Sequence, residues 1–256
     1  MKTSNVSQLT GDVMTDCSLD WSKFLCSAGP CIRPGGAVLT DRALEICGLP
    51  GGSLVVDIGC GAGGTLQHLE QTGGYRVVGL DHSETLLGES ANRVGPARLV
   101  RGSAETLPFR GASFDALFCE CVLSVLDDKP GALREFARVL QGGGFLILSD
   151  VLAQGERSLE AVEGGSPAVG FLVKDDLLGQ LADLGFSVLL WEAHDRLLKE
   201  FVARMILAGE RLPESWCVRG GSGKKRGRSG ITYFLLVAQK GGGVPNAVET
   251  RMEGHA

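Results

Sequence analysis

The sequence predicts an α/β fold in which helices cover both faces of an open, mostly parallel sheet. Two observations carry this prediction. Over residues 53–149, short continuous apolar runs alternate with helical segments, a pattern typical of right-handed βαβ units with strands buried on both sides. The first apolar run, 54–58, opens into a glycine-rich turn at 59–64, where sheets of this class bind nucleotide-like ligands.

Each element follows from its local pattern. Strands are expected at 53–58, 75–80, 97–101, 114–119 and 144–149, with two more at 186–191 and 231–238. Helices are expected at 19–28, 39–47, 132–140, 174–184 and 195–207, and Gly185 ends the fourth of them. With 256 residues, the chain is long enough for one domain with appendages.

The glycine-rich turn is compatible with two kinds of ligand. Gly59, Gly61 and Gly64 match a dinucleotide fingerprint, whereas Gly59, Gly61 and Gly63 match an S-adenosylmethionine (SAM) loop equally well. The acid that ends the first strand, Asp57, discriminates between them. A carboxylate there would repel a pyrophosphate, but it suits the ammonium and sulfonium of SAM. We therefore favour SAM, with a dinucleotide-dependent oxidoreductase as the alternative.

The second strand also ends in an acid, Asp81, which lies 22 residues after Gly59. A carboxylate at that place can accept hydrogen bonds from both hydroxyls of a ribose. Because NAD and SAM both contain this ribose, Asp81 indicates an adenosine ligand without choosing between them. The other interpretation is a helix cap, although Ser83 can cap that helix itself.

Later segments, taken in order, resemble the class I SAM-dependent methyltransferases. They are the turn Ser103-Ala104-Glu105, the fourth strand with Cys119-Glu120-Cys121, and Arg138-Val139-Leu140 followed by three glycines and the strand that ends at Asp150. The resemblance covers about residues 50–150 and is strongest to the type 11 branch. It implies a Rossmann-like three-layer sandwich with a seven-stranded, mostly parallel sheet and an antiparallel C-terminal strand.

The resemblance also implies which residues bind the cofactor. Gly59, Cys60, Gly61 and Gly63 match the loop under the methionine part of SAM, and Asp57 precedes them. Asp81 matches the ribose acid and His82 the residue at the adenine face. Ser103, Ala104 and Glu105 match the adenine edge, where the family usually has Asp in place of Ser103. Cys119, at the end of the fourth strand, completes the expected cofactor set.

The sequence assigns no catalytic residue. A base is needed only if the acceptor must lose a proton. Glu120 is the nearest candidate, although it can instead bind the SAM ammonium or act as a cap. Arg33 would meet the SAM carboxylate if the N-terminal segment covers the pocket, but a surface position is the simpler expectation.

Composition limits the other possibilities. A net charge of −5 and a pI near 5.5 argue against a general nucleic-acid surface, so no nucleic-acid partner is expected. The sequence has neither a membrane-spanning apolar run nor a secretory signal, and a cytoplasmic location is expected. Cys17, Cys26 and Cys31 lack the C-x-x-C spacing of a zinc site, so no metal is expected. These thiols either pack or meet a soft acceptor.

The expected organisation has three parts. Residues 1–48 form an N-terminal lid segment, 49–240 form the methyltransferase domain with an insertion at about 195–228, and 241–256 form a disordered tail. The expected function is SAM-dependent methyl transfer to a small-molecule acceptor, with a non-catalytic SAM-binding protein as another alternative.

Overall fold

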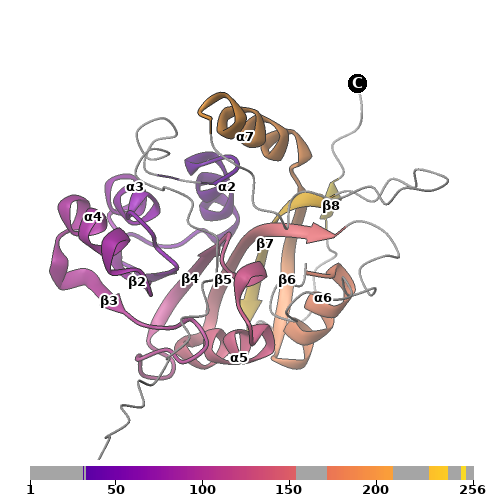
Figure 1. Cartoon of the computed structure of the whole chain (residues 1–256). Coiled ribbons are helices and arrows are strands. Elements are labelled where there is room, and N and C mark those ends of the chain that lie inside the picture. The colour runs from indigo at the N-terminus through magenta and orange to yellow at the C-terminus, as the bar shows by residue number, and fades with distance from the viewer. Residues whose placement is uncertain (1–30, 32, 154–171, 210–230, 242–248, 252–256) are drawn as a thin grey trace, which may run out of the picture.

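The computed structural model describes residues 31, 33–153, 172–209, 231–241 and 249–251. Strands within these ranges are β1 (Leu54–Ile58), β2 (Arg76–Asp81), β3 (Leu99–Arg101), β4 (Phe114–Glu120), β5 (Leu140–Ala153), β6 (Phe186–Ala193), β7 (Ile231–Lys240) and β8 (Glu249–Arg251). They form one sheet in the order β3-β2-β1-β4-β5-β7-β6-β8 (Figure 1).

The strand directions confirm the predicted architecture. The five strands from β3 to β5 are parallel, and β7 runs antiparallel to both β5 and β6. The sheet differs from the prediction at its edge, where β8 pairs with β6 in a parallel register. This strand lies in segment 241–256, which the sequence predicts to be disordered. A three-residue strand has no apolar run to mark it, and pairing with the open edge of β6 forms it.

The helices are α2 (Ala37–Cys47), α3 (Gly64–Gly73), α4 (Glu84–Val94), α5 (Lys129–Val139), α6 (Lys174–Asp183) and α7 (Asp195–Leu207), with short 3-10 turns η1 (Pro96–Arg98) and η2 (Leu123–Val125). One layer contains α2, α3, α4 and α7, and the opposite layer contains α5 and α6 (Figure 1). The expected three-layer sandwich is therefore confirmed. The expected helix at 19–28 lies outside the described residues.

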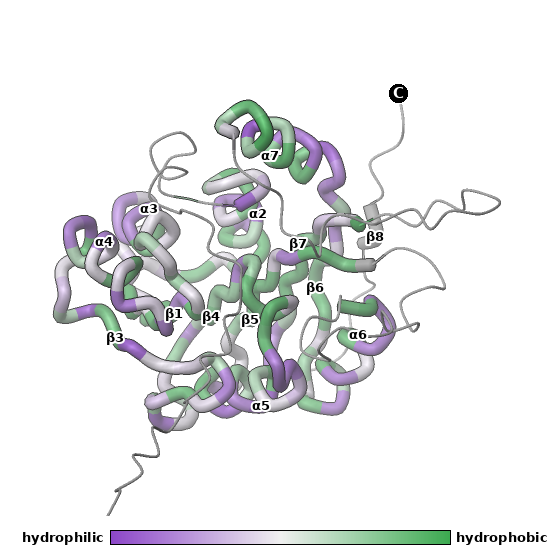
Figure 2. The backbone as a smooth tube through the Cα atoms, viewed as in Figure 1, coloured by the Kyte–Doolittle hydropathy of each residue, from purple (hydrophilic) through white to green (hydrophobic). Residues whose placement is uncertain are grey.

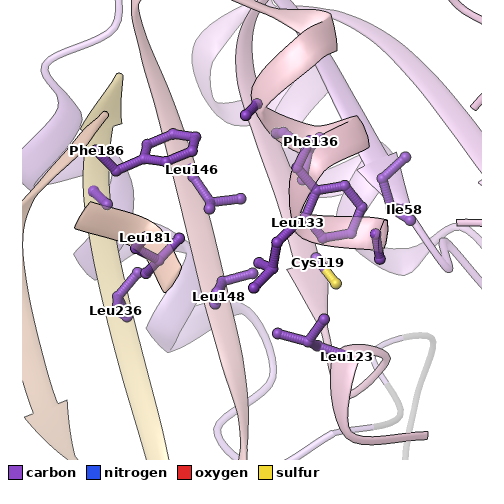
Figure 3. Packing of buried hydrophobic residues seen from close by; sticks show 14 of the residues in the cluster. Ile58, Cys119, Leu123, Leu133, Phe136, Leu146, Leu148, Leu181, Phe186 and Leu236 are labelled. Carbon is purple, nitrogen blue, oxygen red and sulfur yellow. The ribbon is translucent and has the colours of Figure 1, made fainter. Parts of the chain in front are cut away.

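The apolar strands of the sheet separate two cores. In β5, Leu146 and Leu148 face α5 and α6, while Ile147 between them faces the other layer (Figure 3). This alternation is the ordinary period of a strand, and here both faces are buried. Figure 2 shows that the central strands are mostly hydrophobic, and this explains the continuous apolar runs in the sequence.

Two element boundaries differ from the prediction for identifiable reasons. Helix α5 begins at Lys129 because the Asp128 carboxylate accepts a hydrogen bond from the backbone N–H of Gly131 at 2.8 Å. Strand β5 begins at Leu140, earlier than the expected 144, because Leu140 pairs with Phe114 of β4. The glycine run lies in the register shift that follows, before Phe145 pairs with Ala116.

Segment 33–47 is anchored to the far end of the sheet. Leu39 and Ala43 of α2 are buried in the same core as β7 residues, and Arg42 pairs with Glu192 of β6 at 2.9 Å. The turn before α2 lies against α7, since a Cβ added to Gly35 would come 2.9 Å from Leu197 Cδ1. In the part of the chain that the structure describes, no helix combines the length and apolarity needed to cross a membrane.

Candidate functional site

The glycine loop after β1 packs tightly against its neighbours. Gly59 has φ +72°, and an added Cβ would come 2.2 Å from Val122 Cγ2; Gly63 has φ +82°, and its Cβ would come 2.3 Å from Ser90 Oγ. Any side chain at either position would therefore meet both backbone strain and a clash. At Gly61, by contrast, an added Cβ would meet nothing within 4 Å, because this glycine borders open space.

Asp81 at the end of β2 holds this loop in place. Its Oδ2 accepts a hydrogen bond from the backbone N–H of Gly61 at 2.8 Å, and its Oδ1 accepts one from Ser83 N–H at 2.8 Å. Ser83 caps α4 through Leu86 N–H, as the sequence suggests. Asp81 is therefore buried between the loop and the second strand, and each of its oxygens retains a lone pair for a further donor.

An open cavity of about 400 Å³ lies at the carboxyl ends of β1 and β4 and the N-terminus of α3. Three groups of residues line it: residues before α2, residues from β1 through its loop to α3, and the end of β4. They are Cys31, Arg33, Asp57, Gly59, Cys60, Gly61, Ala62, Gly64, Thr65 and Glu120. The expected residues Asp57, Gly59, Cys60 and Gly61 are thus brought together, and Gly63 shapes the loop from behind.

The expected surface position of Arg33 is wrong, and its side chain is buried. It is 4% exposed, and its Nη2 lies 2.7 Å from Glu120 Oε2. The same nitrogen donates to Thr40 Oγ1 at 2.5 Å and to Thr65 Oγ1 at 3.2 Å, while Nη1 donates to the Gly36 carbonyl. Gly36 and Thr40 lie just after Arg33, but Thr65 and Glu120 come from distant elements, and a local sequence pattern cannot reveal these two partners.

The cavity concentrates charge away from water. Burial and the nearby Glu120 carboxylate raise the pKa of Asp57 well above its ordinary value, and the Arg33 guanidinium opposes this rise. Burial is the largest single influence on the pKa of Arg33 and lowers it, but Glu120 together with Tyr233, Cys31 and Cys121 raises that pKa overall, so the guanidinium stays charged. The two carboxyl groups and one guanidinium form a site for a ligand with more positive than negative charge.

One polar atom in this group lacks a partner. Glu120 Oε2 is occupied by Arg33 and by the Thr65 hydroxyl, which donates to it at 2.9 Å. Glu120 Oε1 is buried and has no hydrogen-bond partner among the described residues. A buried acceptor without a donor is costly, so this oxygen is available to a donor from a ligand or a water.

The N-terminal cysteines divide into two groups. Cys31 lines the cavity, and burial raises the pKa of its thiol while the Arg33 charge acts in the opposite direction. Cys17 and Cys26 lie outside the described residues. Among the residues with described positions, no group of three or more His, Cys, Asp or Glu side chains is arranged to hold a metal ion.

The comparisons with known proteins agree with this arrangement. A family model described as "Methyltransferase domain", of the type 11 kind, matches residues 56–148, which run from β1 to β5 and contain the glycine loop, Asp81 and Glu120. Residues 56–148, about a third of the chain, thus match the type 11 methyltransferase domain.

Individual relatives match this chain over part of their length. An uncharacterised protein of Haemophilus influenzae is 29% identical over 60% of this chain and 66% of its own. Malonyl-[acyl-carrier protein] O-methyltransferase of Erwinia pyrifoliae is 34% identical over 51% of this chain and 48% of its own. The alignments thus leave a third to a half of these relatives uncovered.

The fold itself recurs in solved structures. The crystal structure of the [4+2]-cyclase SpnF superposes with a TM-score of 0.67 at 22% identity, covering 87% of this chain and 93% of that chain. At this identity the likeness concerns the fold, and a cyclase among such neighbours shows that the fold alone does not determine the reaction.

The residues expected at the adenine end do not line the cavity. The His82 side chain is 91% exposed, and Ser103 is exposed with its Oγ accepting from Glu105 N–H at 3.2 Å. Ala104 is buried, and Glu105 Oε1 accepts from Asp128 N–H at 2.7 Å before α5. Glu105 therefore has a structural partner, and the proposed adenine contacts of these residues stay predictions.

Cys119 is an expected cofactor residue whose side chain does not line the cavity. Its side chain is 0% exposed and packs with Leu123 and Leu133 in the core beneath α5 (Figure 3). Adjacent residues of a strand point to opposite faces, so Glu120 reaches the cavity while Cys119 points away from it. The Cys119 thiol therefore cannot contact a ligand in the cavity.

Proposed function

We propose that the protein binds SAM and transfers its methyl group to a small-molecule acceptor. The observation that carries this proposal is the buried pair of carboxyl groups, Asp57 and Glu120, beside Arg33 at the glycine loop. The methionine end of SAM has an ammonium, a sulfonium and a carboxylate. Two carboxyl groups and one guanidinium complement this set of charges, and the unpartnered Glu120 Oε1 would accept from the ammonium.

The same charges disfavour the dinucleotide alternative. A pyrophosphate at the loop would lie beside Asp57 and Glu120, both buried where electrostatic repulsion is poorly screened. Arg33 does not offset this, because its single positive charge lies beside two buried carboxyl groups and a pyrophosphate would add further negative charge. Open space at Gly61 fits a ligand lying directly on the loop backbone.

The remaining cofactor residues keep the roles that the resemblance implies. Asp81 would accept hydrogen bonds from the ribose hydroxyls through its free lone pairs, at the end of β2. Ser103, Ala104 and Glu105 with His82 would surround the adenine, which would lie on the more exposed side of the site. When bound, SAM supplies a methyl group already activated by the sulfonium, so the chain's residues need only orient the acceptor and exclude water.

We also propose that segment 1–48 and the insertion at about 195–228 cover the acceptor side. Cys31 and Arg33 of the first segment line the cavity, and α7 of the second packs near the turn at Gly35. In the described parts of these segments, α2 and α7 both contact β7, and α2 also contacts β5, on the side of the sheet away from β2 and Asp81. The malonyl-[acyl-carrier protein] relative suggests a small or carrier-bound acceptor, which the acceptor screen below would identify.

Calorimetry on the full chain tests the cofactor. We expect SAM and S-adenosylhomocysteine to give binding heat and NAD(H) to give none. Tight NAD(H) binding without SAM heat would overturn the proposal. A screen of small-molecule acceptors for S-adenosylhomocysteine release then tests turnover, and SAM binding without any turnover would favour the non-catalytic alternative.

A further inference from the structure

The chain takes an unusual turn where β4 ends. Cys121, the residue after Glu120, has φ +58°; among the described residues, Ala112 is the other non-glycine residue with positive φ. A residue with a Cβ is strained in this left-handed region. Such a conformation persists only when the surroundings hold it, so the neighbours of Cys121 must supply that restraint.

Two contacts from the adjacent strands hold Cys121. Its backbone N–H donates to the carbonyl of Ser149 on β5 at 2.7 Å. Its Sγ lies 3.2 Å from the hydroxyl of Tyr233 on β7, and that hydroxyl donates to Ser149 Oγ at 3.0 Å. Either atom can be the donor in the contact between Cys121 and Tyr233, and the contact ties the turn to β7 in both cases. Burial raises the pKa of both groups, which keeps both protons in place.

The held turn controls the two residues on either side of Cys121. Before it, Glu120 points into the cavity and meets Arg33 and Thr65. After it, Val122 lies over Gly59, where an added Cβ would come 2.2 Å from its Cγ2. A relaxed turn would therefore disturb both the charged side of the cavity and the start of the glycine loop.

We propose that Tyr233 is a positioning residue for the cofactor pocket. Tyr233 is fully buried and does not line the cavity, so it acts through the left-handed turn at Cys121. Its hydroxyl and Ser149 hold that turn, and the turn holds Glu120 and Val122. This inference deepens the proposed function and rests on it through the choice of SAM as the probe.

The experiment compares the same tyrosine substitution in two backgrounds. Tyr233→Phe removes the hydroxyl and keeps the ring. Cys121→Gly allows positive φ without strain, whereas Cys121→Ala keeps the Cβ and loses the thiol. The loss of about one hydrogen bond predicts about five- to tenfold weaker SAM binding for Tyr233→Phe and for Cys121→Ala. Cys121→Gly should bind SAM more tightly than Cys121→Ala, and adding Tyr233→Phe to it should change little.

The outcomes separate positioning from simple packing. An equal loss on Tyr233→Phe in both backgrounds, or weaker SAM binding by Cys121→Gly than by Cys121→Ala, would overturn the proposal. If Tyr233→Phe does not fold, the glycine and alanine variants decide the question by themselves. If the wild-type chain gives no SAM heat, the proposed function fails. Thermal unfolding then tests the positioning, because Tyr233→Phe should lower Tm more in the wild-type background than beside Cys121→Gly, where only its hydrogen bond to Ser149 is lost.

Discussion

The two sides of the candidate cofactor site are built differently. On the β4 side, Arg33, Asp57 and Glu120 are all buried. Arg33 and Glu120 form an ion pair, and burial raises the pKa of Asp57. On the side of β2 and β3, His82 and Ser103 are exposed, and the carboxylate of Glu105 already serves Asp128. Asp81 lies at the border between the two sides and holds the loop.

This difference predicts which substitutions change the free energy of unfolding most. Charges removed from water interact strongly and are costly when left unpaired, whereas exposed groups contribute little to stability or binding. Substitutions on the β4 side should therefore affect both folding and cofactor binding. Substitutions on the exposed side should affect binding slightly and folding hardly at all.

The largest expected effect follows Arg33→Met. It leaves Glu120 buried without its ion-pair partner, and the free energy of unfolding should fall by about 3–5 kcal/mol. Urea denaturation measures it. Arg42→Met is the matched control, since its pair with Glu192 is partly exposed and should cost about 1 kcal/mol or less. A similar loss of stability for both variants would contradict the contrast between a buried and a partly exposed ion pair.

Asp81→Ala comes next. Removing the carboxylate costs the ribose acceptor and the hydrogen bond to Gly61 N–H, so SAM binding should weaken by roughly 2–3 kcal/mol. Calorimetry measures the change. Glu84→Ala removes an exposed carboxylate from the first turn of α4 and should leave the affinity nearly unchanged. Unaltered SAM affinity in folded Asp81→Ala would mean that this residue acts only in the loop.

Asp57→Asn tests the electrostatics through pH. Because folding raises the pKa of Asp57, the folded state binds its proton more tightly, and this contribution to stability is lost as pH rises through the folded-state pKa. The variant should therefore be more stable than wild type near neutral pH and lose less stability between pH 4 and pH 7. Urea denaturation at several pH values measures both effects. A steeper fall in the variant would contradict the assignment.

The same variant should bind SAM about tenfold more weakly, because a charged acceptor becomes neutral. In wild type, SAM affinity should rise with pH as Asp57 ionises, and Asp57→Asn should flatten this dependence. Calorimetry in two buffers of different ionisation enthalpy would detect the released proton. Identical proton release in wild type and variant would exclude Asp57 as its source.

Ser103→Asp should have a small effect of the opposite sign. It restores the carboxylate that the family usually has at the adenine edge, so SAM affinity should stay equal or improve by up to about 1 kcal/mol. Ser103 is exposed, so the fold should tolerate the change. A large loss of affinity in a well-folded variant would show that this turn does not lie beside the adenine.

His82→Ala should have the smallest effect. Because the His82 side chain is 91% exposed, its removal should change the free energy of unfolding by less than about 0.5 kcal/mol. Any weakening of SAM binding then measures stacking against the adenine alone. A large loss of stability would show that His82 has a packing role that its exposure does not suggest.

Much of the fold could be predicted because its elements depend on local patterns. The apolar runs of β1, β4 and β5 and the glycines at 59, 61 and 63 need no distant partner to be recognised. Strand β8 and the early start of β5 could not be predicted in this way. The first depends on pairing with an open edge, and the second depends on a bulge against β4.

By itself, the sequence determined the glycine loop, the two acids Asp57 and Asp81 at the strand ends, and the alternation that builds the sheet. Only the tertiary structure decided that Arg33 is buried against Glu120, that Cys119 points away from the cavity, and that Tyr233 supports Cys121. The physical reason is the sequence distance over which each interaction acts. Backbone conformation and strand period are local, whereas a buried charge or a hydrogen bond between distant strands exists only after the chain has packed.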